Sequence, residues 1–281
     1  MLLVEYEVIK PFNNNVVLAK NLGTEKILIK KGIGFSAKAG DRIPAHTDFE
    51  RVFVIENPET SVKFNQLITR IDHRLVGICE EVLHLICSAI GEKLDEEMHI
   101  RLTDHIAFTV FRLQKNDKID NPFMIEIETL YSKEMEIARQ AIELLEKALD
   151  LYIPEEEAGF IALHIHSLKS KDKLSNTIKY AYICNSAIEI IEDELKIEID
   201  RKSIDYARFA SHIRYAVERI LKNISIKNDL LSAIKKTYKD SYRLAKVVGK
   251  MMAEELYESI PQEEIGYLAL HIERLKNAID N

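Results

Sequence analysis

The sequence predicts a multidomain protein in which a small antiparallel β-sheet domain precedes two tandem all-α domains, each a bundle of about five helices. Three features of the chain predict this fold class. Short runs rich in Val and Ile, separated by turn residues, fill the first fifth of the chain. Apolar residues then recur at helical spacing from about residue 57 onward. The helical part also repeats itself at an offset of 107 residues, which is too long for a solenoid and indicates tandem domains.

The first domain is expected to occupy residues 1–56 and to form one antiparallel sheet. Its β-forming residues gather in four runs, at 3–9, 16–19, 26–29 and 51–55. Asparagines and glycines lie between these runs, and both tolerate the backbone geometry of turns. A sheet of about four strands buries little area, so we expect it to need a partner, and self-dimerisation is the simplest one.

The two helical domains are expected at 62–170 and 171–281. The segments 153–169 and 260–276 align without gaps and are identical at 11 of 17 positions. Each segment has proline as its second residue, followed by acidic residues. Proline suits the first turn of a helix, and acidic side chains there favour the positive end of the helix dipole. Both segments are therefore expected to form equivalent helices.

The composition excludes several classes of protein. Hydrophobic residues make up 47% of the chain, which excludes wholesale disorder. No apolar run approaches the roughly 18–20 residues of a membrane span, and the first residues lack the basic flank and apolar core of a signal peptide. The cysteines at 79, 87 and 184 cannot all pair and lack metal-ligand spacing. We therefore expect a cytoplasmic protein in a reduced setting, without membrane insertion.

Charge is distributed unevenly along the chain. The formal net charge is −7, which argues against a generally basic nucleic-acid binder. Residues 10–40 nevertheless carry six lysines and one acid, Glu25, a local net charge of +5. Residues 57–281 carry 31 basic and 39 acidic residues, a net charge of −8. A basic patch on the sheet domain and an acidic helical body indicate separate functions for the two parts.

Two histidines recur with identical spacing in the helical repeats. Each pair is 59 residues apart and the second pair follows the first by 107: His105 with His164, and His212 with His271. Arg112 and Arg219 follow the first histidine of each pair by seven residues, which places them on its helix face. Imidazole is largely neutral and nucleophilic at physiological pH and can accept a phosphoryl group, which an arginine can then bind. The pattern suits reversible histidine phosphorylation, with Arg112 and Arg219 as phosphate supports.

Two other interpretations of these histidines stay open. Ile161 and Leu168 share the helix face of His164, as expected for a hydrogen-bonded core histidine, although four histidines at matched positions favour function. A metal site is the second alternative. His164 and His166 point to opposite faces of a helix and cannot chelate one ion, and Glu273 replaces His166 in the second copy. We therefore expect no metal site and no cofactor, and interpret His166 as structural or peripheral.

The first domain carries three segments with a recognisable pattern: Asn-Asn-Asn-Val-Val-Leu-Ala at 13–19, Lys-Gly-Ile-Gly-Phe at 31–35 and Arg-Val-Phe-Val-Ile at 51–55. They resemble the N-terminal RNA-binding domain of the BglG/SacY family of bacterial transcriptional antiterminators. The segment 102–106 with Arg112, the two Pro-Glu-rich helices and the 59-residue spacing resemble the two phosphotransferase regulation domains of that family. Three further segments are most similar to the glucose-type members, which control a glucose permease operon: 104–108, 121–123 and 159–167.

The resemblance implies a homodimer whose two sheets bind a short RNA hairpin that overlaps a transcription terminator, so that transcription continues. Motif position implies that the RNA contacts are Asn15, Lys30, Lys31, Gly32 and Phe35. Asparagine reads base edges or sugars, phenylalanine stacks on an unpaired base, and lysines bind phosphates. Many members have Gly-Arg where this chain has Lys30-Lys31, so a planar guanidinium is lost. The alternative is that Phe35 belongs to the core and the lysines only solvate an edge strand.

The resemblance also implies that the sugar phosphotransferase system phosphorylates His105, His164, His212 and His271. In glucose-type members the sugar-specific enzyme II modifies the first regulation domain when sugar is scarce, and this inactivates the protein. The carrier protein HPr can modify the second domain. The chain would then be a regulatory substrate of these proteins and not an enzyme.

Two rival functions compete with this interpretation. A metal-dependent helical phosphohydrolase would use Asp104, His105, His164 and His166, but Ser211 replaces the aspartate in the second copy and no HExxH motif occurs. A DNA-binding regulator with the same regulation domains would need a helix-turn-helix, whereas the first domain alternates as strands do. An RNA-binding antiterminator is therefore the leading hypothesis.

Overall fold

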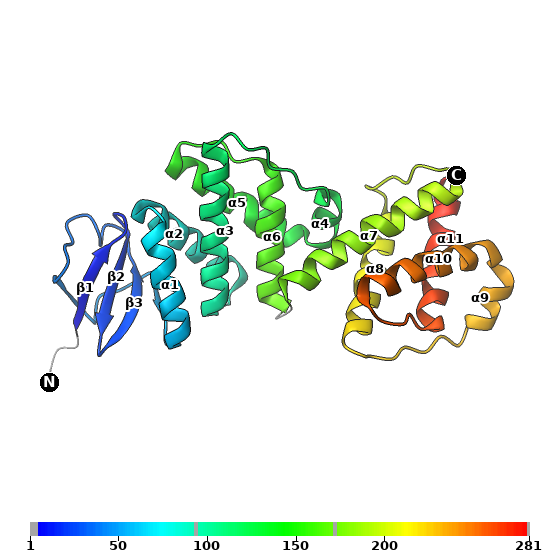
Figure 1. Cartoon of the computed structure of the whole chain (residues 1–281), viewed down its shortest axis with the longest axis horizontal. Helices are drawn as coiled ribbons and strands as arrows, with labels where there is room; N and C mark the ends of the chain where they lie inside the picture. The colour runs from blue at the N-terminus through cyan, green and yellow to red at the C-terminus, as the bar shows by residue number, and fades with distance from the viewer. Residues whose placement is uncertain (1–4, 93–94, 171–172, 280–281) are drawn as a thin grey trace. The chain divides into compact units, whose positions relative to one another are not determined.

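The computed structural model describes residues 5–92, 95–170 and 173–279 of the chain (Figure 1). These residues form a small five-stranded antiparallel sheet followed by helices, which confirms the predicted fold class. They divide into two compact units, the first within 1–120 and 134–171 and the second within 121–133 and 172–281. None of the described helices is long and apolar enough to cross a membrane.

The sheet occupies the start of the first unit. Its strands are Glu5–Pro11 (β1), Val16–Asn21 (β2), Thr24–Ile29 (β3), Arg42–Pro44 (β4) and Arg51–Val54 (β5). Their order is β4-β1-β2-β3-β5, and every neighbouring pair is antiparallel. Leu22 and Gly23 form the turn between β2 and β3 with φ angles of 49° and 89°, as two-residue hairpin turns favour. The short β4 is absent from the four expected strands because Arg-Ile-Pro carries little β pattern.

Both faces of the sheet are covered within the chain. Side chains alternate between the two faces along each strand. On one face, Val17, Ala19 and Leu28 pack against apolar residues of the segment that joins β3 to β5. On the other face, Val16 and Ile29 are buried, and the helix His73–Ile90 (α2) packs against β2. The chain itself therefore covers both faces of the sheet, and self-dimerisation of this domain stays a prediction.

The other helices of the first unit are Pro58–Arg70 (α1), Glu96–Gln114 (α3), most of Ser132–Leu149 (α5) and Glu155–Ser170 (α6). Three of the helix starts are fixed by side-chain caps, in which Asn57, Asp72 and Asp95 accept hydrogen bonds from backbone N–H groups of the first turn. Helices α3 and α6 pack against each other, and they carry the first histidine pair.

The second unit contains the helices of the second repeat. They are Leu174–Leu195 (α7), Ile204–Leu221 (α8), Leu231–Thr237 (α9), Lys239–Leu256 (α10) and Gln262–Ile279 (α11). The bounds of α10 coincide with those of α5 once the offset of 107 is applied. Helices α8 and α11 pack together and carry the second histidine pair, as α3 and α6 carry the first.

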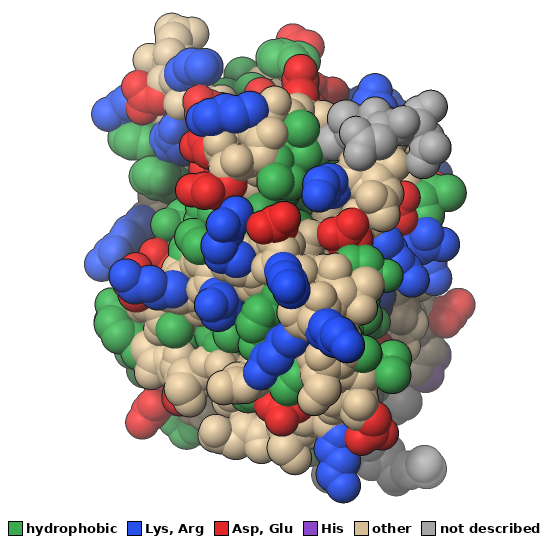
Figure 2. Space-filling view, turned by 90° about the vertical axis from the view of Figure 1, so that its right-hand side faces the viewer, with side chains coloured by type: hydrophobic (Ala, Val, Ile, Leu, Met, Phe, Trp, Pro, Cys, Tyr) green, Lys and Arg blue, Asp and Glu red, His purple; other side chains and the backbone are tan. Residues whose placement is uncertain are grey.

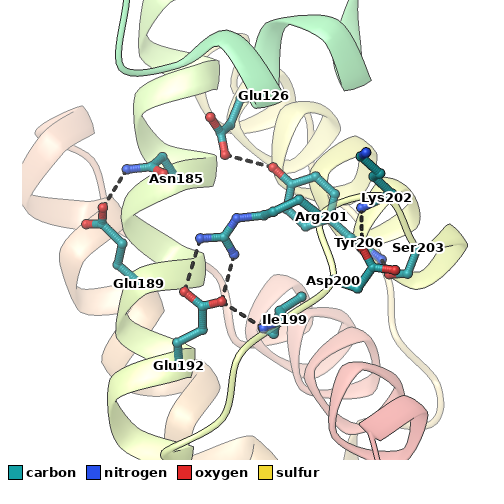
Figure 3. A network of polar contacts seen from close by, with 10 residues as sticks. All are labelled: Glu126, Asn185, Glu189, Glu192, Ile199, Asp200, Arg201, Lys202, Ser203 and Tyr206. Atoms are coloured by element: carbon teal, nitrogen blue, oxygen red, sulfur yellow. Dashed lines mark hydrogen bonds and ion pairs between the residues drawn. The ribbon is translucent and has the colours of Figure 1, made fainter.

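The short helix Met124–Leu130 (α4) lies in the second unit, although its residues come from the first repeat. It is the counterpart of α9 at the offset of 107, yet it packs against α7 and α8. Its buried Glu126 accepts a hydrogen bond of 2.7 Å from the hydroxyl of Tyr206 on α8 (Figure 3). Beside this contact, Arg201 donates two hydrogen bonds of 3.0 Å to Glu192 of α7. The domain bounds 1–56, 62–170 and 171–281 stay a prediction. The compact units group α4 with the second repeat.

Candidate functional site

The first histidine pair lies where α3 and α6 pack. The ring centroids of His105 on α3 and His164 on α6 are 5.0 Å apart, with the ring planes at 40°. His164 is buried at 7% exposure, whereas 20% of the His105 side chain is exposed. Helix packing therefore joins two residues that are 59 positions apart, and leaves one ring partly accessible to a partner.

A buried carboxylate accompanies this pair. Glu157 of α6 lies seven residues before His164, two helical turns away on the same face. Its Oε2 atom is 3.0 Å from Nε2 of His105 and accepts a hydrogen bond of 2.9 Å from the Thr109 hydroxyl. A neutral His105 that donates its Nε2–H to Glu157 keeps the lone pair of Nδ1 free. The contact therefore favours the tautomer that has its free lone pair on Nδ1.

Burial keeps the inner ring of this pair neutral. Burial, and then the nearby charges of His105 and Arg101, lower the pKa of His164 to about 3. Its Nδ1 atom is buried and has no hydrogen-bond partner among the described residues. Near neutral pH His164 is therefore an uncharged imidazole in contact with His105.

The second histidine pair repeats this arrangement on α8 and α11. The ring centroids of His212 and His271 are 4.5 Å apart, and the rings are stacked at 24°. Burial, and then the nearby charges of His271 and Arg219, lower the pKa of His212 to about 3. The pKa of His271 is also lowered, first by burial and then by Arg274 and Arg208. Both repeats thus hold two imidazoles together in a partly buried setting.

The carboxylate of the second pair binds a different group. Glu264, the counterpart of Glu157, is buried and accepts hydrogen bonds of 2.7 and 2.9 Å from Nε and Nη2 of Arg219. Nε2 of His212 is 3.9 Å from Glu264, beyond hydrogen-bond distance, and has no hydrogen-bond partner among the described residues. The arginine therefore takes the carboxylate that a histidine takes in the first repeat.

The expected phosphate supports differ between the repeats. Arg219 donates to Glu264, whose carboxylate also lies 3.9 Å from His212 of the second pair. By contrast, Nη2 of Arg112 donates a hydrogen bond of 2.7 Å to the carbonyl oxygen of Lys118. The Arg112 guanidinium also lies over the Phe108 ring, 5.9 Å from its centroid. In the described part of the chain these contacts of Arg112 lie outside its histidine pair, so its role as a phosphate support stays a prediction.

Sequence reasoning missed two sets of residues at these sites. The first set comprises Glu157 and Glu264, which the pattern explains as helix-start acids. The second comprises Arg101 and Arg208, whose charges act on the buried histidine His164 and on His271. The signal that identifies all four is the offset of 107, since each arginine precedes a paired histidine by four residues, one helical turn.

The sheet domain brings together several of the expected RNA contacts. Oδ1 of Asn15 accepts a hydrogen bond of 3.0 Å from the backbone N–H of Gly32, and its carbonyl oxygen accepts one of 3.0 Å from the N–H of Lys30. Lys31 is exposed, whereas Nζ of Lys30 donates to the carbonyl oxygen of Asp48 at 2.7 Å. Phe35 is 79% exposed, so it is not a core residue. Asn15 and the turn at 30–32 therefore form one continuous surface.

Gly34 is required by the packing of this surface. Its N–H donates a hydrogen bond of 2.9 Å to the carbonyl oxygen of Asn14. A Cβ atom at this position would collide with the backbone carbonyl of Asn13. The glycine therefore allows the 30–35 turn to lie directly against the asparagine loop.

His166 of α6 contacts a different set of side chains from the first histidine pair. Its Nδ1 atom is 3.4 Å from Glu134, which also accepts a hydrogen bond of 2.8 Å from Nζ of Lys169. Burial would raise the pKa of Glu134, but these hydrogen bonds hold it at about 2. Within the described ranges, no three His, Cys, Asp or Glu side chains are grouped so that they could hold a metal ion.

Known families match both parts of the chain. Residues 6–62 match the CAT RNA binding domain, and residues 80–168 and 185–275 match the PRD domain. The match of the first domain to an RNA-binding family overturns the alternative of a DNA-binding head.

Relatives match nearly the whole chain. Protein GlcT of Staphylococcus aureus, in strain bovine RF122 / ET3-1 and in strain JH9, is 34% identical over 279 residues, which cover 98% of this chain and 99% of each relative. A solved structure, the crystal structure of GlcT CAT-PRDI, is 38% identical with a TM-score of 0.50, and covers 58% of this chain and 98% of that chain. The chain therefore belongs to the GlcT-like transcriptional antiterminators, which are regulatory RNA-binding proteins with a CAT domain and PRD domains and are not enzymes.

Proposed function

We propose that this antiterminator controls a sugar-uptake operon, and that this operon encodes a glucose permease. Reversible histidine phosphorylation of the antiterminator switches its RNA binding on and off. The observation that carries the proposal is the repeated site. Both helical repeats hold two imidazoles at ring contact, with a buried carboxylate seven residues before the second. Packing alone has no need for two polar rings and an acid at the same positions of both copies.

The output of the switch is RNA binding by the sheet domain. Asn15 and the turn at 30–32 offer hydrogen-bond donors and acceptors, Lys31 offers a positive charge, and Phe35 offers an exposed ring for stacking. The bound RNA is a hairpin that overlaps a terminator in the leader of the operon. Two chains form a homodimer on this hairpin in the cytoplasm, where the transcript is made.

The input is transfer of a phosphoryl group from a donor protein to a ring nitrogen. In the first repeat, Glu157 holds the Nε2–H of His105, so the lone pair of Nδ1 attacks the phosphorus atom and the bond to the donor breaks. The product adds about −1.5 to −2 charges next to a buried carboxylate. Arg112 and Arg219 are the proposed phosphate supports, and Arg101 adds a further cation near His164. Repulsion between like charges of two subunits then weakens the active dimer.

The two repeats receive different inputs, enzyme II on the first and HPr on the second. Charge supports this difference. Residues 222–250 carry eight basic and two acidic residues, a net of +6, whereas the aligned residues 115–143 carry four basic and seven acidic residues, a net of −3. On the face of the second unit seen in Figure 2, Lys and Arg side chains gather across the middle. One donor surface cannot complement both charge patterns equally well.

Charge substitution at His105 tests the proposal. We expect His105→Asp to weaken binding of a terminator-overlapping hairpin by about tenfold, because a fixed carboxylate imitates part of the phosphoryl charge. His105→Ala is the matched control and should bind RNA as the wild type does, and in cells it should stay active without sugar. The measurements are RNA affinity and the dimer dissociation constant. Equal RNA affinity and equal dimerisation of His105→Asp and wild type would contradict the mechanism.

A further inference from the structure

We infer, on the basis of the proposed RNA-binding role of Asn15, that Glu81 of α2 competes with RNA for the asparagine amides of the sheet domain. The first helical repeat thereby lowers the RNA affinity of the sheet domain through a direct contact. The contact lies within the first unit, where α2 packs against β2.

Glu81 binds two asparagines with one oxygen atom. Its Oε1 accepts hydrogen bonds of 2.9 Å from Nδ2 of Asn13 and of 3.1 Å from Nδ2 of Asn15. All three side chains are partly buried. Hydrogen bonds to a charged acceptor are stronger than neutral ones, so the carboxylate holds both amides firmly.

The side-chain oxygen of each asparagine also accepts a hydrogen bond. Oδ1 of Asn13 accepts a hydrogen bond of 2.8 Å from the backbone N–H of Asn15, and Oδ1 of Asn15 accepts one from Gly32. An asparagine reads a base edge by presenting its oxygen and its NH₂ group together. Glu81 occupies the NH₂ groups of the asparagines, and its negative charge lies where RNA phosphates would approach.

The surface of α2 is shaped to receive this loop. Gly77 lies one turn before Glu81, and a Cβ atom at Gly77 would come within 2.6 Å of Cγ and Nδ2 of Asn13. A methyl group at position 77 would therefore push the Asn13 side chain away from the helix. Gly77 and Glu81 therefore provide two independent ways to break one contact, the first by steric exclusion and the second by removal of the acceptor.

Part of the RNA surface stays accessible while the contact is made. Lys31 and Gly32 are exposed, and so is Phe35. The contact of Glu81 with Asn13 and Asn15, called the clamp below, therefore restrains the asparagine edge of the surface. The side of the surface that carries Lys31 and Phe35 stays open. A restraint of this kind weakens RNA binding without abolishing it.

Equilibrium RNA binding by the full chain tests the inference. The probe is a synthetic, fluorescently labelled hairpin from the terminator-overlapping leader of a glucose permease operon. We expect Glu81→Ala to tighten binding by about five- to tenfold, since both amides lose their charged acceptor. Gly77→Ala should tighten binding by a smaller factor, since it displaces Asn13 alone. Alanine is a better helix former than glycine, so Gly77→Ala leaves α2 intact.

A matched control separates the contact from a general charge effect. Glu143 of α5 lines the same surface hollow as Glu81, and Glu143→Gln removes a nearby negative charge without touching the asparagines. Its affinity should stay within about twofold of wild type. Circular dichroism of all variants checks that each is folded.

The outcomes distinguish failure of the clamp from failure of the proposed function. Unchanged or weaker binding by Glu81→Ala and Gly77→Ala, with a wild-type chain that binds the hairpin and an Asn15→Ala variant that does not, overturns the clamp alone. A wild-type chain that ignores the hairpin, or an Asn15→Ala variant that binds it normally, overturns the RNA site itself. An equal gain in Glu143→Gln and Glu81→Ala assigns the effect to general charge and also overturns the clamp.

Discussion

Single substitutions between the repeats decide what each buried carboxylate binds. In the first repeat Thr109 supports Glu157 from one side, and its counterpart in the second repeat is Ala216, which has no hydroxyl to donate. Without that donor, Glu264 is bound by Arg219 through two hydrogen bonds. The first site is therefore a carboxylate and histidine pair, and the second is a carboxylate and arginine pair.

Buried histidines make the stability of the protein depend on pH. The pKa values of His164 and His212 are lowered to about 3, below the value of an exposed histidine, mainly by burial. Between about pH 3 and pH 6.5, these histidines bind more protons in the unfolded chain than in the folded chain. The free energy of unfolding should therefore fall as the pH falls from about 6.5 toward 3, by up to about 1.4 kcal/mol per pH unit for each histidine.

Urea unfolding at pH 7 and at pH 5 measures this dependence. We expect His164→Gln to lose less stability on acidification than the wild type does, and a double variant with His212→Gln to lose less still, because glutamine does not titrate. Identical pH dependence in the wild type and both variants would show that these rings are not buried as neutral groups.

At the scale of elements, α4 shows that sequence repeats and packing units differ. Helices α4 and α9 have matching bounds, but α4 packs against α7 and α8. Its link to α8 is the hydrogen bond between Tyr206 and Glu126, both of which are buried. Helical periodicity gives the apolar face of such a segment, but it does not say which repeat supplies the surface that covers that face.

Removal of one hydroxyl tests the link between α4 and α8. We expect Tyr206→Phe to reduce the free energy of unfolding of the second unit by about 1–3 kcal/mol, because it leaves the buried Glu126 without its donor. Tyr267→Phe is the control, since the Tyr267 hydroxyl donates to the carbonyl oxygen of Lys227 at an exposed site and should contribute less than about 0.5 kcal/mol. Equal stability of Tyr206→Phe and wild type in urea unfolding would count against this link.

At the scale of the whole molecule, patterning in the sequence was sufficient to predict the order of sheet and helices. The runs at 16–19, 26–29 and 51–55 lie within or overlap β2, β3 and β5, because alternating Val and Ile side chains are buried on both faces of the sheet. The three-residue β4 could not be predicted, since its pairing with β1 depends on a distant strand. Coverage of the second sheet face by α2 could not be predicted either, because it depends on tertiary packing.

The histidine pairs were predictable because duplication preserves spacing, which is visible in one chain. Their surroundings were harder to predict. Glu157 contacts His105, and the charge of Arg101 lowers the pKa of His164, in both cases across the interface of α3 and α6. The only sign of these two residues in the sequence is that they recur as Glu264 and Arg208 in the second repeat. The contact between Glu81 and Asn15 could not be predicted from a repeat, since it joins a helix to a loop 66 residues away.

Direct mapping of phosphate tests the central claim, that two unequal histidine pairs are the inputs to one RNA-binding output. The full chain is incubated with phosphorylated HPr, with and without a glucose-type enzyme II, and acid-labile phosphate is assigned to each histidine. We expect label on His105 or His164 only when enzyme II is present, and label on His212 or His271 with HPr alone. Absence of label from all four histidines under both conditions would contradict the claim.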